Sequence, residues 1–124
     1  MILHIDVPWL LDVQEQAVPE DVSVADYSAL VAAVARHKTR IPRPTTADPD
    51  PAWRAAALLH TLIRLQPLPY RNSLYACQVT AAYMNASGEG IDPPYGAMVD
   101  LVRDIQADKT SVYQAADRIR TWRI

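Results

Sequence analysis

Apolar side chains recur every three to four positions along most of this chain, and prolines separate one such run from the next. That spacing is typical of amphipathic helices. No segment of useful length alternates between apolar and polar residues, so we expect at most a short edge strand in residues 1–5. The pattern therefore predicts an all-α fold, a compact bundle of about six helices with short connections.

Each predicted helix starts at a residue that can cap it, often with a proline in the first turn. We expect the first helix to end before Pro19, the second to end in the basic segment Lys38–Arg43, and the fourth to close at Gly88. Residues 41–51 hold four prolines without an apolar period and predict a loop. In chain order, the predicted caps are Asp6, Ser23, Asp50, Asn72 or Ser73, Asp92, and Thr110 or Ser111.

The third predicted helix is apolar on nearly all sides, with Trp53, Leu59 and Ile63 among its residues. A helix of that kind belongs at the centre of a bundle. It also carries His60, which we interpret as a core histidine satisfied by a hydrogen bond rather than as a catalytic base.

The composition limits the classes of protein to be considered. The 124 residues are 50% apolar and 21% charged, which suits one folded domain over residues 1–124. A net charge of −2 gives no reason to expect a direct nucleic-acid partner. A single cysteine fits a reducing cytoplasm, and neither a signal peptide nor a membrane helix is predicted. We expect no metal site, because the three histidines are far apart in the sequence: His4, His37 and His60.

Charge is distributed unevenly along the chain. Residues 1–26 contain six acidic residues and no lysine or arginine. Two basic groups follow, and each is either a solvated face or, for the first group, part of an anion site near the middle of the chain. The first group is Arg36, Lys38, Arg40 and Arg43, and the second is Arg118, Arg120 and Arg123.

The junction between the third and fourth predicted helices contains the residues most suggestive of chemistry. Two prolines stiffen the turn, which delivers Arg71 and Asn72 to the start of a helix. Free backbone amides at a helix start favour anions, and a guanidinium suits phosphate. The simpler alternative is an asparagine cap beside an exposed arginine. The amides expected to point out of the helix end are those of Ser73, Leu74 and Tyr75.

This junction resembles the core signature of the Fic/Doc family, a helix–loop–helix with the pattern H-x-F-x-x-G/A-N-G/K-R. The corresponding window is Gln66-Pro67-Leu68-Pro69-Tyr70-Arg71-Asn72-Ser73-Leu74. The helix that follows, with Ala76, Tyr83, Met84 and Gly88, looks like the Doc-type helix after the motif. The segments Asp6–Leu11 and Ala57–Leu59 are similar to the opening helix and to the helix before the motif. The resemblance covers the middle third of the chain by sequence and most of it by architecture.

The resemblance implies a role for each matching position. Gln66 stands where the family has the histidine that deprotonates a target hydroxyl, and Leu74 stands where it has the arginine that holds nucleotide phosphates. Asn72 matches the asparagine that fixes the motif loop, and Leu68 replaces a phenylalanine that fills an apolar pocket. A glutamine amide cannot act as a general base. Gln66 and Asn72 are therefore the candidate catalytic positions, and the candidate nucleotide-binding positions are Arg71, Asn72, Ser73, Leu74 and Tyr75.

Two functions follow from this resemblance, and a third does not depend on it. The first is a Doc-like toxin of a toxin–antitoxin pair that transfers a phosphoryl or nucleotidyl group from ATP with magnesium to a hydroxyl of a translation-related protein. A small antitoxin protein would neutralise it by lying across the site. The second is a catalytically inactive Fic/Doc-fold binding module that pairs with an antitoxin-like partner. The third is an unrelated helical adaptor.

Overall fold

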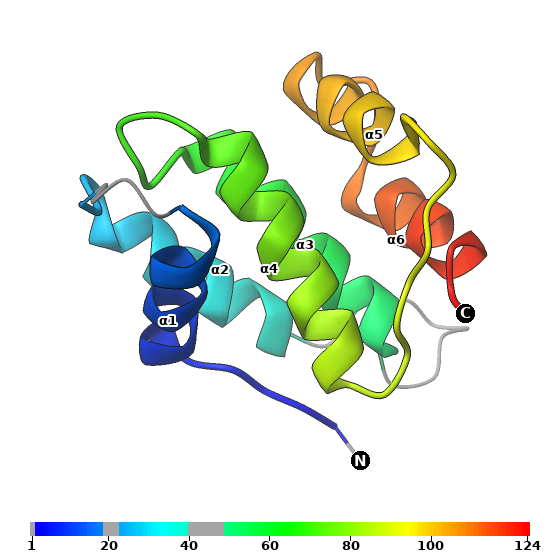
Figure 1. Ribbon diagram of the computed structural model, residues 1–124, viewed down its shortest axis with the longest axis horizontal. Helices are drawn as coiled ribbons and strands as arrows, with labels where there is room; N and C mark the ends of the chain where they lie inside the picture. The colour runs from blue at the N-terminus through cyan, green and yellow to red at the C-terminus, as the bar shows by residue number, and fades with distance from the viewer. Residues whose placement is uncertain (1, 19–22, 40–48) are drawn as a thin grey trace.

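The computed structural model of the protein describes residues 2–18, 23–39 and 49–124. Within these ranges the chain forms six helices and no strand, which confirms the predicted all-α fold (Figure 1). A single antiparallel bridge pairs Ile91 with Arg123. None of the helices described is both long enough and apolar enough to cross a membrane. The helices are α1 (Val7–Ala17), α2 (Tyr27–Lys38), α3 (Pro51–Leu65), α4 (Asn72–Ala86), α5 (Ala97–Gln106) and α6 (Val112–Thr121).

Three of the predicted caps are confirmed by hydrogen bonds. The Asp6 carboxylate accepts from Trp9 N at 2.9 Å, and the Asp50 carboxylate accepts from Trp53 N at 3.0 Å. Both helices have a proline in their first turn. Ser111 forms a reciprocal capping box with Gln114 at the start of α6. These three starts form locally, because the cap and the amides it satisfies lie within three residues of each other.

Two predicted caps are wrong, and long-range backbone contacts explain both. Helix α2 is capped by Asp26 instead of Ser23, because the amides of residues 25 and 26 donate to Pro67 O and hold that segment extended. Helix α5 begins after Gly96, at φ 83°, instead of after Asp92. The Asp92 amide donates to Trp122 O at 2.8 Å, so its segment pairs with the end of the chain.

The ends of α2 and α4 agree with the sequence. Helix α2 ends at Lys38, at the start of the predicted basic segment. Gly88 follows the last residues of α4 with a φ of 82°, a conformation that suits glycine. Residues 40–48, which include most of the predicted proline loop together with Arg40 and Arg43, lie outside the described residues.

Helix α3 is the centre of the bundle, as its apolar sequence predicts. Eleven of its fifteen residues are buried, and it packs against α2, α4, α5 and α6. Figure 1 shows α1 and α2 on one side of the α3–α4 pair, with α5 and α6 on the other. Four fully buried alanines let neighbouring helices approach α3 closely; they are Ala52, Ala55, Ala56 and Ala57.

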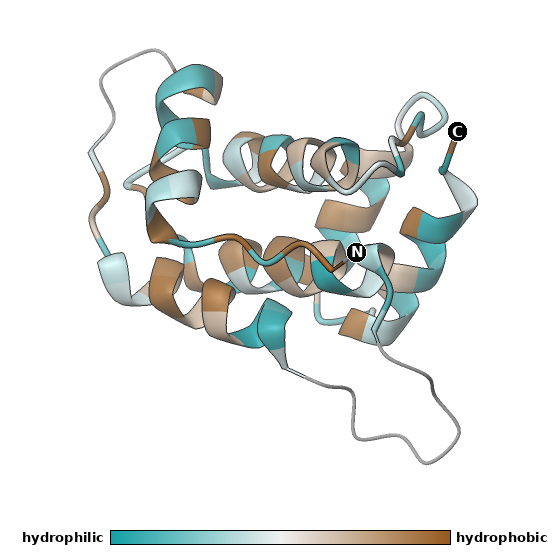
Figure 2. Ribbon diagram, turned by 90° about the horizontal axis from the view of Figure 1, so that it is seen from below, coloured by the Kyte–Doolittle hydropathy of each residue, from teal (hydrophilic) through white to brown (hydrophobic). Residues whose placement is uncertain are grey.

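The residues before α1 form an extended segment that side chains hold against the helices (Figure 2). Leu3 O accepts a hydrogen bond from the Tyr83 hydroxyl at 2.5 Å, and Ile5 N donates to His37 Nε2 at 3.0 Å. Among the described residues it has no strand to pair with, so the edge strand allowed by the sequence does not form. This segment instead brings His4 next to α2 and α3.

Candidate functional site

The loop between α3 and α4 is fixed by one side chain at its far end. Asn72 Oδ1 accepts from Leu68 N at 2.9 Å, and Asn72 Nδ2 donates to Leu68 O at 2.8 Å. Leu68 itself is buried in the core, so the loop is also anchored by an apolar side chain. Pro67 O accepts from the amides of residues 25 and 26, which ties the same loop to the start of α2. The loop is therefore held from both sides.

Asn72 does not cap α4, contrary to the first alternative from the sequence. It is the first residue of the helix, and the N-cap is Arg71, at φ 62° without a side-chain cap hydrogen bond. Ser73 does not cap the helix either, because it lies one residue further in. The side-chain amide of Asn72 forms hydrogen bonds with both backbone groups of Leu68, so it cannot also cap the helix.

The anion site predicted at the start of α4 is smaller than expected. Tyr75 N donates to Arg71 O at 3.0 Å, so this amide is not available to a ligand. The Tyr75 ring is fully buried, and its hydroxyl donates to Leu10 O at 2.7 Å. Burial also raises the pKa of this phenol above its ordinary value. The prediction that the backbone amide of Tyr75 binds a nucleotide is therefore wrong. Of the three predicted amides, only those of Ser73 and Leu74 come before the first hydrogen bond of the helix.

The two positions that correspond to the histidine and the final arginine of the motif are exposed. Gln66 is the C-cap of α3, in the left-handed region at φ 50°, and its side chain lies at the surface. Leu74 is 36% exposed in the first turn of α4. An amide and an isobutyl group supply neither a proton acceptor of useful basicity nor a positive charge. The site therefore offers partial charges from the backbone at these positions, and no ionisable side chain.

Leu74 forms part of an apolar groove between α4 and α5. The groove has a volume of about 450 Å³. At one edge the Ser73 hydroxyl accepts from Gln106 Nε2 at 3.3 Å, which links the two helices. Sequence reasoning missed the α5 side, although the exposed Val99 within an amphipathic helix was a signal for it. The lining residues are Ser73, Leu74, Cys77, Met98, Val99, Val102, Arg103 and Gln106.

Cys77 lines this groove as a small apolar residue. Burial raises the pKa of its thiol to about 11, so the thiol is protonated at neutral pH. A protonated thiol in this position acts as a small apolar group and not as a nucleophile.

A magnesium–ATP complex needs oxygen ligands, and these decide what the groove can hold. Magnesium prefers carboxylate and phosphate oxygens as ligands, and no carboxylate lines the groove. Across the described residues, no group of three or more histidine, cysteine, aspartate or glutamate side chains is placed to hold a metal ion. No carboxylate of the groove is therefore placed to share a magnesium ion with nucleotide phosphates.

His60 is half-buried and lies on the face of α3 toward α2. Its Nδ1 is 2.9 Å from Arg36 Nη1, and a guanidinium can only donate, so the ring nitrogen accepts. Burial, together with the positive charges of Arg36 and Arg64, lowers the pKa of His60. The expected hydrogen bond is present, but the ring lines a shallow pocket instead of the core.

The two basic groups of the sequence have different surroundings. Each arginine of the second group forms an ion pair with an acidic side chain: Arg118 with Asp104, Arg120 with Asp50 and Arg123 with Glu89. In the first group Arg36 contacts His60, whereas Lys38 lines a small pocket beside the buried Arg54. Sequence reasoning missed Arg54, although a lone cation in the apolar start of α3 was a signal for it.

No model of a known protein family matches the chain, and no curated protein matches its sequence. Membership of the Fic/Doc family therefore stays a prediction, which rests on the motif segment Gln66–Leu74 and its surroundings.

Proposed function

We propose that this chain is the Doc-like component of a toxin–antitoxin pair and acts by binding an antitoxin-like protein at the α4–α5 groove. One observation carries the proposal. Leu74, at the motif position of a phosphate-binding arginine, lines an apolar groove of about 450 Å³. The motif loop keeps its support from Asn72, so the resemblance and the loop geometry favour the family while the groove favours binding over group transfer.

The chemistry of the groove supports a partner with an apolar anchor. Leu74 and Val99 are 36% and 53% exposed, so both sides of the groove present apolar surface to solvent. Ser73, Arg103 and Gln106 provide a polar rim. An apolar centre with a polar rim is typical of protein interfaces, and an amphipathic helix can place one apolar face in such a groove. Arg103 at the rim favours an acidic residue beside that anchor.

One feature favours the alternative function, transfer of a phosphoryl or nucleotidyl group. The amides of Ser73 and Leu74 lie in the first turn of α4, where the helix dipole favours anions. A labelling experiment separates the two functions. The purified chain is incubated with cell extract and with ATP labelled at either the γ or the α phosphate. We expect no labelled protein with either nucleotide, and a labelled target band would overturn the binding-only function.

The same assay has a positive control within the chain. The double variant Gln66→His with Leu74→Arg restores the histidine and the final arginine of the motif pattern. Both positions are exposed, so the substitutions leave the core unchanged. Under the proposed family assignment we expect this variant to gain labelling activity. Absence of labelling by the restored variant, with an intact fold by circular dichroism, counts against the Fic/Doc assignment itself.

A binding experiment tests the groove directly. The probe is the small protein encoded by the short reading frame next to this gene, and the absence of such a frame contradicts the toxin–antitoxin assignment. We expect Val99→Asp to weaken binding about ten-fold, equivalent to about 1.4 kcal/mol. The matched control is Val31→Asp on α2, because Val31 has a similar exposure of 58% and does not line the groove. Equal effects of the two substitutions would show that the partner does not use the groove.

A further inference from the structure

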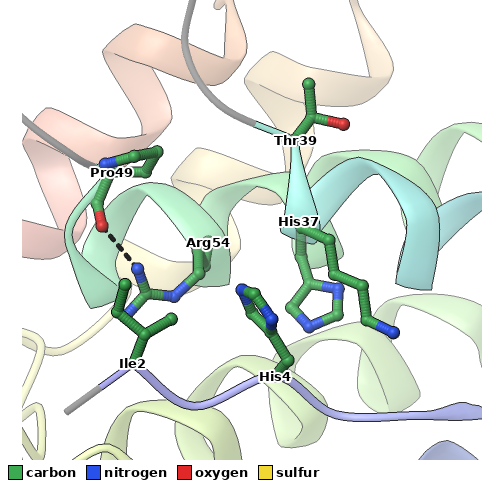
Figure 3. A pocket seen from close by; sticks show the side chains of 7 residues that line it. Ile2, His4, His37, Thr39, Pro49 and Arg54 are labelled. Atoms are coloured by element: carbon green, nitrogen blue, oxygen red, sulfur yellow. Dashed lines mark hydrogen bonds between the residues drawn. The ribbon is translucent and has the colours of Figure 1, made fainter.

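A second pocket, separate from the α4–α5 groove, lies where the N-terminal segment crosses the end of α2 and the start of α3. Figure 3 shows the side chain of His4 between those of Arg54 and His37. Lys38 and Thr39 line the pocket from the end of α2. Its volume is about 130 Å³, well below the roughly 300–1,000 Å³ of pockets that enclose a drug-sized molecule. Only a small group fits inside.

Arg54 is the buried charge of this pocket, with 3% of its surface exposed. Its Nε donates to the Tyr83 hydroxyl at 2.7 Å, and its Nη1 donates to Pro49 O. Both acceptors are neutral. Among the described residues no carboxylate forms an ion pair with Arg54, although the arginines of α6 all have one. Within the described residues this buried cation has only neutral partners, which is unfavourable, and an anion in the pocket would lower that cost.

The donors of Arg54 are not exhausted by these bonds. A guanidinium carries five N–H groups, and the two bonds above use two of them. The hydroxyl of Tyr83 is also committed, because it donates to Leu3 O at 2.5 Å. Arg54 is therefore held in place by neutral groups, and the other N–H groups of its guanidinium have no acceptor among the described residues.

Of the other polar side chains that line the pocket, some already form hydrogen bonds within the described part of the chain and others do not. His37 uses both ring nitrogens, since Nε2 accepts from Ile5 N and Nδ1 donates to Val34 O. The Thr39 hydroxyl donates to Ala35 O at 3.0 Å. The exposed side chains of Lys38 and His4 form no such hydrogen bond within the part of the chain that the structure describes. No acidic side chain lines the pocket.

We propose that this pocket binds a phosphate group, held by Arg54, Lys38 and His4. A guanidinium and an ammonium that both line a small pocket suit a compact oxyanion with more than one charge. The phosphate is either free or the terminal phosphate of a nucleotide whose remainder lies outside the pocket. This site is independent of the groove and of the function proposed for it. It also gives Lys38, in the first basic group, a role that the charge pattern alone left open.

The test uses the full chain and inorganic phosphate, measured by isothermal titration calorimetry at constant ionic strength with chloride as the competing anion. We expect saturable binding that chloride does not reproduce. His4→Gln and Lys38→Gln change exposed side chains, so both variants should fold, and we expect each to weaken phosphate binding about five-fold or more. The matched control is Lys109→Gln, which removes the same charge from an exposed lysine outside the pocket.

Two results would overturn the proposal. One is the absence of saturable binding up to about 10 mM phosphate, and the other is an equal loss of affinity in Lys109→Gln and Lys38→Gln. A parallel titration with AMP identifies the source of the phosphate. Tighter binding of AMP than of phosphate, with the same dependence on Lys38, assigns the site to a nucleotide, and equal binding assigns it to the free ion.

Discussion

Acid should destabilise this protein through one buried ring, that of His37. The ring is fully buried, and Ile5 N donates to its Nε2 at 3.0 Å. A proton on Nε2 would face that N–H group and break the hydrogen bond. Burial is the main cause that lowers the pKa of His37 from 6.5 to about 4, and the charges of His4, Lys38 and Arg54 lower it further. The carbonyl of Val34 acts in the opposite direction.

The size of the effect follows from the two pKa values. Between about pH 4 and pH 6.5 the unfolded chain binds a proton on this histidine and the folded chain does not. The contribution of His37 to stability is therefore complete above pH 6.5 and is lost as the pH falls toward 4. At 1.36 kcal/mol for each pH unit, the loss amounts to about 3 kcal/mol. That is a large part of the roughly 5–15 kcal/mol that stabilises a typical domain.

The assay is a series of urea titrations followed by tryptophan fluorescence, at pH values from about 7 to about 4. We expect the free energy of unfolding to fall across this range in the wild-type chain and to fall much less in His37→Gln, whose amide oxygen can still accept from Ile5 N. His60 has the same sign, because its pKa is also lowered. His60→Gln measured in parallel separates the two contributions. An identical pH dependence in wild type and His37→Gln would refute the reasoning.

Three further substitutions test single contacts. Asn72→Ala removes both hydrogen bonds to the motif loop, and we expect urea titration to show a loss of about 1–3 kcal/mol; a loss below about 0.5 kcal/mol would mean that the loop holds itself. Tyr83→Phe leaves Arg54 Nε buried without an acceptor, and a melting temperature unchanged from wild type would contradict the expected loss of about 1–3 kcal/mol. Asp50→Asn keeps the helix cap but removes the charge opposite Arg120, so we expect a loss of about 1 kcal/mol that shrinks in high salt.

Features that depend on neighbouring residues could be predicted from the sequence. The caps Asp6, Asp50 and Ser111 act on amides within three residues, and their helices start where the sequence predicts. The central place of α3 followed from its apolar composition, because such a helix has no face suited to water. The burial of Leu68 was also predictable, since an apolar side chain between two prolines of a short turn can reach the core.

Features that depend on distant partners could not be predicted. The start of α5 is set by the pairing of residue 92 with the end of the chain, thirty residues away. The Tyr75 hydroxyl donates to Leu10 O in α1, a contact that spacing along the chain does not reveal. The groove and the Arg54 pocket each join elements from separate parts of the chain. Sequence patterns identify amphipathic faces, but which faces meet is decided by packing.

Gln66 and Leu74 can change without disturbing the fold, because both side chains are exposed. Substitutions at exposed positions usually change stability by no more than about 0.5 kcal/mol, and both side chains lie outside the core. The residues that hold the loop lie between Gln66 and Leu74 in the sequence. Leu68 is buried and Asn72 is half-buried. Other side chains could therefore replace this glutamine and this leucine by nearly neutral steps. The scaffold would survive such a change, whatever it does to binding or chemistry at this end of α4.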